Sequence, residues 1–168
     1  MRYVTTWPGC LVGLSLVTSV ATAGCRGVEF VDECGLELQV TADAREYAPR
    51  DSVTFTMVLS NRGELSVYVP GSFLEYGPLP CAVPASGKVE HFKATFAAPD
   101  CKSLPDRGDL ILEPGDSVTF AKSAPALPEP GLQQWSFEGA LYRCPAIPHS
   151  VDCGIESNMV EVMVRPER

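Results

Sequence analysis

Apolar and polar side chains alternate with a period of two along several short segments, and this pattern constrains the fold more than any other feature. In the segment 53–59, Val53, Phe55, Met57 and Leu59 occupy every second position. Successive side chains of a β-strand point to opposite faces, so the alternation predicts a strand with one face against a core. No segment shows a long 3.6-residue period. The sequence therefore predicts an all-β fold.

About seven strands are predicted, separated by turns that draw on 15 prolines and 14 glycines. The candidate segments, eight when the short one at 110–112 is counted separately from 118–120, are 36–41, 53–59, 65–69, 89–96, 110–112, 118–120, 135–142 and 159–164. This number of strands in about 130 residues is typical of an immunoglobulin-like antiparallel β-sandwich, in which two sheets pack over one core.

Three connections carry specific expectations. Residues 61–64 (NRGE) are expected to form a hairpin-like connection, because Asn and Gly tolerate a positive φ. Pro114-Gly115 fits the centre of a type II turn. Residues 123–131 (SAPALPEPG) are expected to be irregular because of their prolines.

Two seven-residue segments share six identities. Residues 49–55 read PRDSVTF and residues 114–120 read PGDSVTF. The flanking sequences do not match, so a duplicated half-domain is disfavoured. We interpret both segments as a proline turn that leads into a strand with Val and Phe pointing inward.

The first 24 residues are predicted to be a signal peptide. Residues 10–23 are apolar and small, and this run is too short to span a bilayer as a helix. An uncleaved anchor is therefore disfavoured. The predicted organisation is a signal peptide at 1–24, an N-terminal segment at 25–35 and a β-sandwich domain at 36–166.

Two cleavage chemistries fit the end of this signal. Ala21-Thr22-Ala23 suits ordinary signal peptidase and would leave Gly24 first. Thr22-Ala23-Gly24-Cys25 resembles a bacterial lipobox, which implies a lipid on Cys25, although Thr22 stands where Leu or Val is usual. Both outcomes stay open, and both predict export, either to the periplasm or medium or to a lipid anchor on the bacterial envelope.

Seven cysteines lie at positions 10, 25, 34, 81, 101, 144 and 153. Cys10 leaves with the signal, and the other six can form three disulfides in an oxidising compartment. A lipid on Cys25 would leave five, with one unpaired. Fifteen connectivities are possible for six cysteines. Proximity in sequence favours Cys81 with Cys101, Cys144 with Cys153, and Cys25 with Cys34.

The charge and the motifs exclude several classes of function. After residue 24 there are 21 acidic residues and 12 basic ones (13 less Arg2), a net charge of −9. Such a chain repels phosphate backbones and lacks a basic patch for anionic lipid, so we expect no nucleic acid, and membrane contact only through a lipid on Cys25. The chain has no CxxC and only two histidines, so no metal or cofactor is expected.

No enzymatic site is predicted. The sequence contains no GxSxG elbow, P-loop, EF-hand loop or HExxH motif. His91 lies in a strand-like run, and His149 lies in a loop between Cys144 and Cys153. Cysteines in disulfides cannot act as thiolate nucleophiles. We therefore expect a protein that is not an enzyme.

Two cysteine-bearing segments are the candidate binding surface. Residues 71–87 carry Phe73, Leu74, Tyr76 and Leu79, and residues 144–155 carry Ile147, Val151 and Ile155. Apolar side chains on braced loops suit recognition. The alternative is that they cover the ends of the core, and we favour it because apolar atoms supply over half of ordinary protein surface.

The segment 138–144 (EGALYRC) resembles strand F of immunoglobulin domains. That resemblance implies that Tyr142 forms a tyrosine corner, with its hydroxyl bonded to upstream backbone. The segment 53–59 has no cysteine for Cys144 to meet, so the usual inter-sheet bridge is absent. Over residues 36–164 the chain also resembles bacterial extracellular sandwich domains, including the BsuPI-type proteinase-inhibitor domain and the sandwich that precedes some secreted metallopeptidases.

These observations favour an exported, non-enzymatic β-sandwich module that binds a protein or a glycan at the bacterial envelope. The alternative, implied by the BsuPI-type resemblance, is a proteinase inhibitor that acts through a loop. A shared fold does not by itself transfer either function.

Overall fold

The computed structural model describes residues 34–87, 90–91, 108–144 and 146–167. One short helix, α1 (Gly71–Tyr76), lies among strands. The strands are β1 (Leu36–Ala42), β2 (Glu46–Tyr47), β3 (Ser52–Asn61), β4 (Val67–Val69), β5 (Leu79–Val83), β6 (Glu90–His91), β7 (Leu110–Leu112), β8 (Ser117–Pro125), β9 (Gly131–Leu141), β10 (Cys153–Glu156) and β11 (Val160–Val164). The all-β prediction is confirmed.

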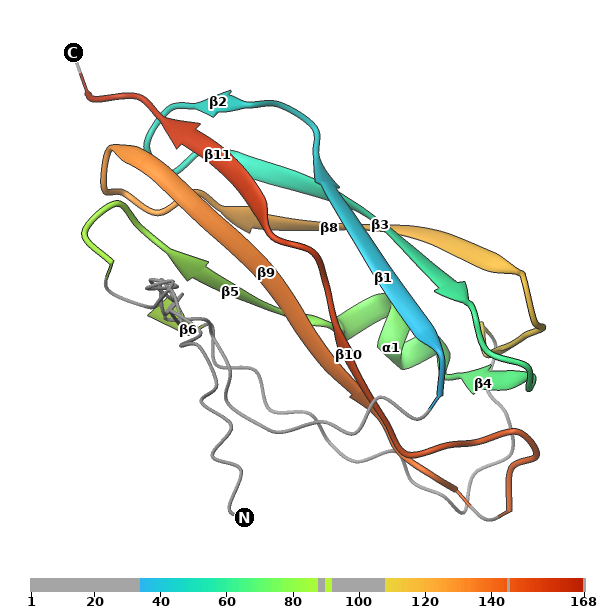
Figure 1. Cartoon of the computed structure of the whole chain (residues 1–168). Helices are drawn as coiled ribbons and strands as arrows, with labels where there is room; N and C mark the ends of the chain where they lie inside the picture. Colours follow the sequence, from blue (N-terminus) through green and yellow to red (C-terminus); the bar gives the residue numbers. More distant parts are fainter. Residues whose placement is uncertain (1–33, 88–89, 92–107, 145, 168) are drawn as a thin grey trace, which may run out of the picture.

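The strands form two larger sheets and one small one. Sheet A has the order β1-β3-β8, and sheet B has the order β2-β11-β9-β5-β6, with β10 also paired to β9. Strands β4 and β7 pair with each other. Every pairing between named strands is antiparallel except that of β2 with β11. Sheets A and B lie face to face, as in a β-sandwich (Figure 1).

The core lies between these two sheets and is centred on β3. Val53, Phe55, Met57 and Leu59 are fully buried, as their alternation predicts. The Phe55 ring lies 5.2 Å from the ring of Trp135 and 4.8 Å, edge-on, from that of Phe137, measured between centroids. Tilted and edge-to-face contacts of this kind add to the stabilisation that comes from burial. The aromatic side chains of β9 therefore join the two sheets.

The two related segments each form a turn followed by a strand. The N–H of Asp51 donates to the carbonyl of Ala48 at 3.1 Å, and that of Asp116 donates to the carbonyl of Glu113 at 3.0 Å. Gly115 has φ +87°, which confirms the predicted type II turn. The strands that follow, β3 and β8, are antiparallel neighbours. In β8, however, the equivalent Val and Phe are only half-buried, because β8 is the edge of its sheet.

Strand β8 extends further than predicted. It continues through Pro125, inside the segment 123–131 that was expected to be irregular. The N–H of Ala126 donates to the carbonyl of Asp51 at 2.8 Å, so its neighbour Pro125 turns its nitrogen to the outer edge of the sheet. A proline is tolerated there because no ladder hydrogen bond is needed.

The expected hairpin at residues 61–64 is wrong. Strand β4 does not pair with β3 but with β7. Asn61 is fully buried, and its Nδ2 donates to the carbonyls of Leu65 and Leu112, each at 2.8 Å, while its Oδ1 accepts from the N–H of Gly63 at 2.9 Å. The hydrogen bonds of the Asn61 side chain hold the backbone after β3 in a course that leaves sheet A. The chain therefore does not return along β3 as a hairpin would.

A disulfide joins Cys34 to Cys153 across 119 positions of sequence. The expected pairs Cys25 with Cys34 and Cys144 with Cys153 are therefore wrong. Cys34 lies just before β1, and Cys153 opens β10, so the fold brings together residues that proximity in sequence could not connect. Cys81 and Cys144 are also disulfide-bonded.

Cys25, Cys101 and the predicted signal segment lie outside the described residues, and so does most of the strand expected at 89–96. The pairing of Cys81 with Cys101 stays a prediction. Within the described part of the chain, no helix is long and apolar enough to cross a membrane.

Candidate functional site

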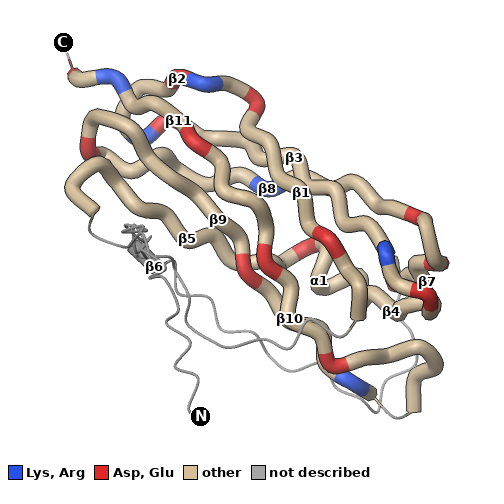
Figure 2. The backbone as a smooth tube through the Cα atoms, viewed as in Figure 1, with Lys and Arg blue, Asp and Glu red and all other residues tan. Residues whose placement is uncertain are grey.

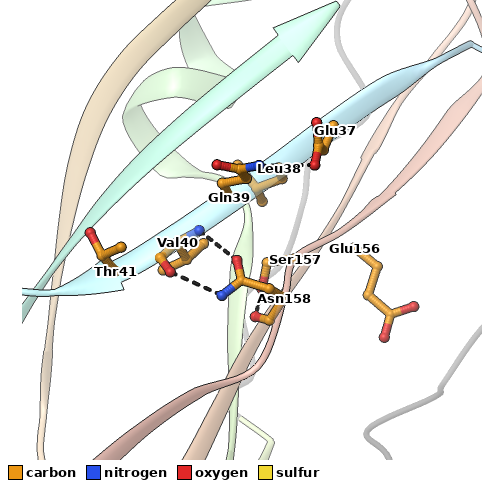
Figure 3. Close-up of a pocket in the computed structure, with 8 residues that line it drawn as sticks. All are labelled: Glu37, Leu38, Gln39, Val40, Thr41, Glu156, Ser157 and Asn158. Atoms are coloured by element: carbon orange, nitrogen blue, oxygen red, sulfur yellow. Dashed lines mark hydrogen bonds between the residues drawn. The ribbon is translucent and has the colours of Figure 1, made fainter. Parts of the chain in front are cut away.

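A groove of about 480 Å³ lies along the side of β1 that does not pair with β3. Its wall on one side is β1 itself, and on the other it is the connection between β10 and β11 (Figure 3). The lining residues are Glu37, Leu38, Gln39, Val40, Thr41, Glu156, Ser157 and Asn158. The groove is shallow and largely open to solvent.

A β-bulge builds the second wall. Glu156 pairs with Glu138 and Val160 pairs with Trp135, so the three residues 157–159 oppose only two residues of β9. One extra residue on one strand is the defining count of a bulge, and bulges bend a strand and redirect its side chains. The N–H of Ser157 donates to the carbonyl of Phe137 at 2.9 Å, and its Oγ accepts from the Phe137 N–H at 2.9 Å, which fixes the bulge on β9.

The redirected side chain is that of Asn158, which bonds to the edge of β1. Its Oδ1 accepts from the N–H of Val40 at 2.7 Å, and its Nδ2 donates to the carbonyl of Val40 at 3.0 Å. Next to it, Leu38 and Ser157 form an isolated parallel bridge. Figure 3 shows Asn158 reaching toward Val40. The bulge therefore closes the gap between sheet A and sheet B at the base of the groove.

Glu37 is held in place at one end of the groove. Gln39 Nε2 donates to its Oε1 at 3.0 Å, and Arg62 Nε donates to its Oε2 at 3.0 Å. The hydrogen bond from Gln39 and then that from Arg62 lower the pKa of Glu37 below its ordinary value. The side chain is therefore a fixed carboxylate at neutral pH. Glu156, at the other wall, points away from β1 (Figure 3).

The lining mixes apolar and polar side chains, and the amides of Gln39 and Asn158 and the hydroxyl of Ser157 are already hydrogen-bonded within the protein. The eight lining residues offer carboxylates, side-chain amides and hydroxyls, but no Lys, Arg, His, Cys or aromatic side chain. The Ser157 hydroxyl donates to the carbonyl of Asn158 at 2.7 Å, so no base activates it. Among the described residues, no cluster of three or more potential metal ligands occurs.

The outer face of sheet A adjoins the groove and carries small, mostly uncharged side chains. In the pairing register, Gln39 lies beside Val58 and Thr119, and Thr41 lies beside Thr56 and Ala121. The full set is Glu37, Gln39 and Thr41 on β1, Thr54, Thr56 and Val58 on β3, and Ser117, Thr119, Ala121 and Ser123 on β8, whereas Ser60 at the end of β3 is buried. Figure 2 shows β3 without a charged position.

The candidate surface predicted at residues 71–87 is mostly not a loop. It contains α1 and β5, and Phe73 is buried in the core, with Leu74 packed against it. Tyr76 is 68% exposed. In the second segment Ile147 and Ile155 are buried, and Val151 is half-buried. Most of these apolar side chains therefore cover the core, as the favoured alternative predicts.

The remaining predicted site residues are dispersed. Tyr142 is 47% exposed, and its role as a tyrosine corner stays a prediction. Tyr47, in contrast, is buried, and its hydroxyl donates to Asp43 Oδ1 at 2.6 Å and accepts from the N–H of Ala44 at 2.8 Å. His91 lies in β6, paired with Cys81, and His149 is exposed in the loop after β9.

Sequence reasoning missed the groove, although one signal of it was present. The buried positions of β10 are the odd-numbered Cys153 and Ile155, whereas those of β11 are the even-numbered Val160, Val162 and Val164. A change of parity within one extended segment requires an extra residue, which is the bulge. The contact of Asn158 with β1 depends on the packing of the sheets and leaves no such trace.

No protein-family model and no curated protein sequence matches the chain. Solved structures do resemble its fold. The ApaA protein from Bordetella pertussis has a TM-score of 0.50 at 14% identity over 82% of this chain and 99% of that one. Spo0M, a sporulation control protein from Bacillus subtilis, has a TM-score of 0.41 at 14% identity over 79% of this chain and 50% of that one. A β-glucosidase from Listeria innocua has a TM-score of 0.37 at 12% identity over 78% of this chain and 16% of that one. The first likeness shows the fold alone, and the lower scores carry no argument.

Proposed function

We propose that this protein is an exported, non-enzymatic module with an immunoglobulin-like sandwich that binds a protein or a glycan at the bacterial envelope. The observation that carries this proposal is the groove beside β1, whose lining combines apolar and hydrogen-bonding side chains and contains no His, Cys or Lys; among the described residues there is also no metal-binding cluster. A concave site of this kind recognises a ligand without transforming it.

The disulfides support the part of the proposal that concerns export. Cys34, Cys81, Cys144 and Cys153 are all disulfide-bonded. Structural disulfides persist in the periplasm and outside the cell and are rare in the cytosol. Together with the predicted signal peptide at 1–24, they favour a destination outside the cytoplasm.

Intact-mass measurement of the protein purified from its native cell fractions tests export. The sample is alkylated before and after reduction. We expect a chain that starts at Gly24, or one that starts at Cys25 with the mass of a lipid, and disulfide cysteines that react only after reduction. A full-length cytoplasmic chain with reduced cysteines would refute the proposal.

Retention on purified envelope fractions tests binding. We expect Thr41→Arg, which places a long cation in the groove, to reduce retention at least tenfold. Leu132→Arg is the matched control, because Leu132 is an exposed strand residue of sheet B that lies outside the groove. Equal retention of both variants and the wild type would show that the groove is not the binding site.

The inhibitor alternative has less support from the described loops. Residues 146–149 fold as turns, the N–H of Ile147 donates to the carbonyl of Cys144, and Ser150 Oγ bonds to the backbone of both. Such a segment lacks the extended backbone that pairs with a protease cleft. Tight inhibition of any member of a serine, cysteine and metalloprotease panel would reverse this ranking.

A further inference from the structure

We propose that the groove beside β1 and the outer face of sheet A together form a binding surface for a neutral polysaccharide. This inference rests on the function proposed above and names the class of ligand. It follows from the unequal distribution of charge on the two sheets, from the polarity of the face and from its shape.

The two outward faces differ in charge. The outer face of sheet A carries the ion pair of Glu37 with Arg62 at its end and otherwise Ser, Thr, Gln, Val and Ala. Lys122 of β8 lies beside the buried Phe55 and so belongs to the inner face. Sheet B, in contrast, carries Glu138 and Glu161 on partly or fully exposed positions. In a chain with a net charge of −8, sheet A therefore presents a nearly uncharged surface.

The polarity of this face favours a ligand rich in hydroxyl groups. A protein partner that packed a dry surface against it would remove many Ser and Thr hydroxyls from water, and each unpaired hydroxyl costs about 1–3 kcal/mol. A polysaccharide presents donors and acceptors along its length and can pair with them. Thr54 Oγ1 and Ser123 Oγ, 3.4 Å apart on neighbouring strands, illustrate the close spacing of such groups.

The outer face of sheet A is also long and narrow. Three strands about 4.8 Å apart and about 30 Å long form a strip roughly 15 Å wide. A linear polymer that lies along the strands matches this shape.

The carboxylates of the groove bear on the class of ligand. Glu37 is fixed as an anion by Gln39 and Arg62, and Glu156 is exposed at the other wall. No cation lines the groove. Because Arg62 balances the charge of Glu37, the site offers little net charge to select a charged polymer, whereas sugar hydroxyls can donate to the carboxylate oxygens.

A matched pair of glutamines makes the test specific. Gln39 on sheet A and Gln134 on sheet B each donate Nε2 to a glutamate Oε1 at 3.0 Å. Both lie on strands, but only Gln39 lines the groove. We expect Gln39→Ala to weaken glycan binding about tenfold, the loss of about one good hydrogen bond, and Gln134→Ala to leave it unchanged.

The probes are neutral hexasaccharides of glucose, mannose and N-acetylglucosamine, with an anionic uronic-acid hexasaccharide and hexalysine as comparisons, measured by titration calorimetry on the mature protein. We expect binding of at least one neutral probe at millimolar or lower concentration, with little change between low and high salt, because uncharged contacts are not screened. A fluorinated hexasaccharide observed by NMR gives an independent readout.

Binding of hexalysine alone, weakened by salt, would show that the surface is a site for basic peptides and would overturn the inference. The absence of binding to every neutral probe would also overturn the inference. An equal loss of glycan affinity in Gln39→Ala and Gln134→Ala would overturn it as well. If the protein fails on glycans but is retained on envelope fractions through the groove, the proposed function stands and only the ligand class is refuted. If it is neither exported nor retained, both are refuted.

Discussion

Three side-chain amides take the place of backbone partners where strands end or lie at an edge. Asn61 joins the ends of β3 and β7, and Asn158 bonds to Val40 on β1. Gln133 is fully buried, and its Nε2 donates to the carbonyls of Leu127 and Glu129 at 2.9 and 3.0 Å. An amide offers a donor and an acceptor at once, as the peptide group does. Each of these amides therefore holds in place a segment that lacks a regular ladder of backbone hydrogen bonds.

Tyr47 gives a prediction with a defined pH dependence. Its side chain is 6% exposed, and burial together with the hydrogen bond to Asp43 raises its pKa to about 12. A group that prefers its proton in the folded state adds stability below its ordinary pKa of 10.0, and this stability is lost as the pH rises toward 12. We expect Tyr47→Phe to lower the free energy of unfolding by about 1–2 kcal/mol at pH 7.

Urea denaturation of both proteins at pH 7 and near pH 11.5 measures this effect. The difference between the wild type and Tyr47→Phe should shrink at the higher pH, because the wild type then loses the contribution of its neutral hydroxyl. A difference that stays constant between pH 7 and pH 11.5 would show that the pKa of the Tyr47 hydroxyl is the same in the folded and the unfolded protein.

Gly115 and Arg50 occupy equivalent positions in the two related turns, with φ values of +87° and +66°. A left-handed conformation is free of steric cost for glycine and unfavourable for a residue with a Cβ. We expect Gly115→Ala to lower the free energy of unfolding by about 1 kcal/mol, and Arg50→Gly to leave it equal or to raise it slightly. Thermal denaturation of the two variants checks the sign, and a stabilising Gly115→Ala would contradict the turn geometry.

The elements most clearly predicted from sequence are strands in which apolar side chains alternate with polar ones, because that alternation shows directly which side chains are buried. Strand β3 could be found because each second side chain enters the core. The pairing of β4 with β7 could not, since the turn residues 61–64 are equally compatible with a hairpin, and only the buried amide of Asn61 decides between the two. Similarly, the burial of Tyr47 and the partial exposure of Tyr142 depend on the packing of the sheets.

The two edges of sheet A are protected in different ways. At β1, Asn158 occupies the N–H and the carbonyl of Val40. At β8, the inner face carries Lys122, whose Nζ donates to the carbonyl of Glu75 and whose pKa is lowered mainly by burial. A charge that points inward at an edge, followed by Pro125, discourages the addition of a further strand.

Asn158 is therefore the position at which to test the edge of β1. We expect Asn158→Ala to lower the free energy of unfolding by about 1–2 kcal/mol, because two hydrogen bonds are lost. Asn158→Asp keeps the acceptor for the Val40 N–H but places a carboxylate against the Val40 carbonyl, so its stability should recover as the pH falls and the carboxyl binds a proton. Chemical denaturation at pH 7 and pH 4 measures both, with Gln39→Ala as the control.

An Asn158→Asp variant that is as stable as the wild type at pH 7 would contradict the hydrogen bond to the Val40 carbonyl. Loss of stability in Gln39→Ala of the same size as in Asn158→Ala would show that the groove is sensitive to any truncation.

At the scale of the whole molecule, the disulfide between Cys34 and Cys153 encloses most of the sandwich, with a sequence separation of 119. Closing so large a loop restricts the unfolded chain strongly. We expect the double variant Cys34→Ser/Cys153→Ser to lower the free energy of unfolding by about 4 kcal/mol. Guanidinium denaturation under oxidising conditions measures this, and a loss below about 1 kcal/mol would contradict a dominant role for this cross-link.

The cysteine spacing could predict that disulfides form, but not which residues they join. Cys34 and Cys153 meet because β1 and β10 lie on different sheets whose edges come together at the bulge, and this contact exists only in the folded molecule. The candidate site has the same origin. Neither Val40 nor Asn158 is unusual in its local sequence, and the groove arises from the register of two strands that are far apart in the chain.

The same cross-link determines how the molecule would respond to a mechanical load. A pull applied through the N-terminal segment enters at Cys34 and passes through the disulfide directly into β10. The 119 positions between the two cysteines then cannot be drawn out, which removes roughly 400 Å of extension. The covalent path of force between Cys34 and the C-terminus runs through β10 and β11, which pass it to β9 through their hydrogen bonds, while β3 and β8 of sheet A remain outside that path.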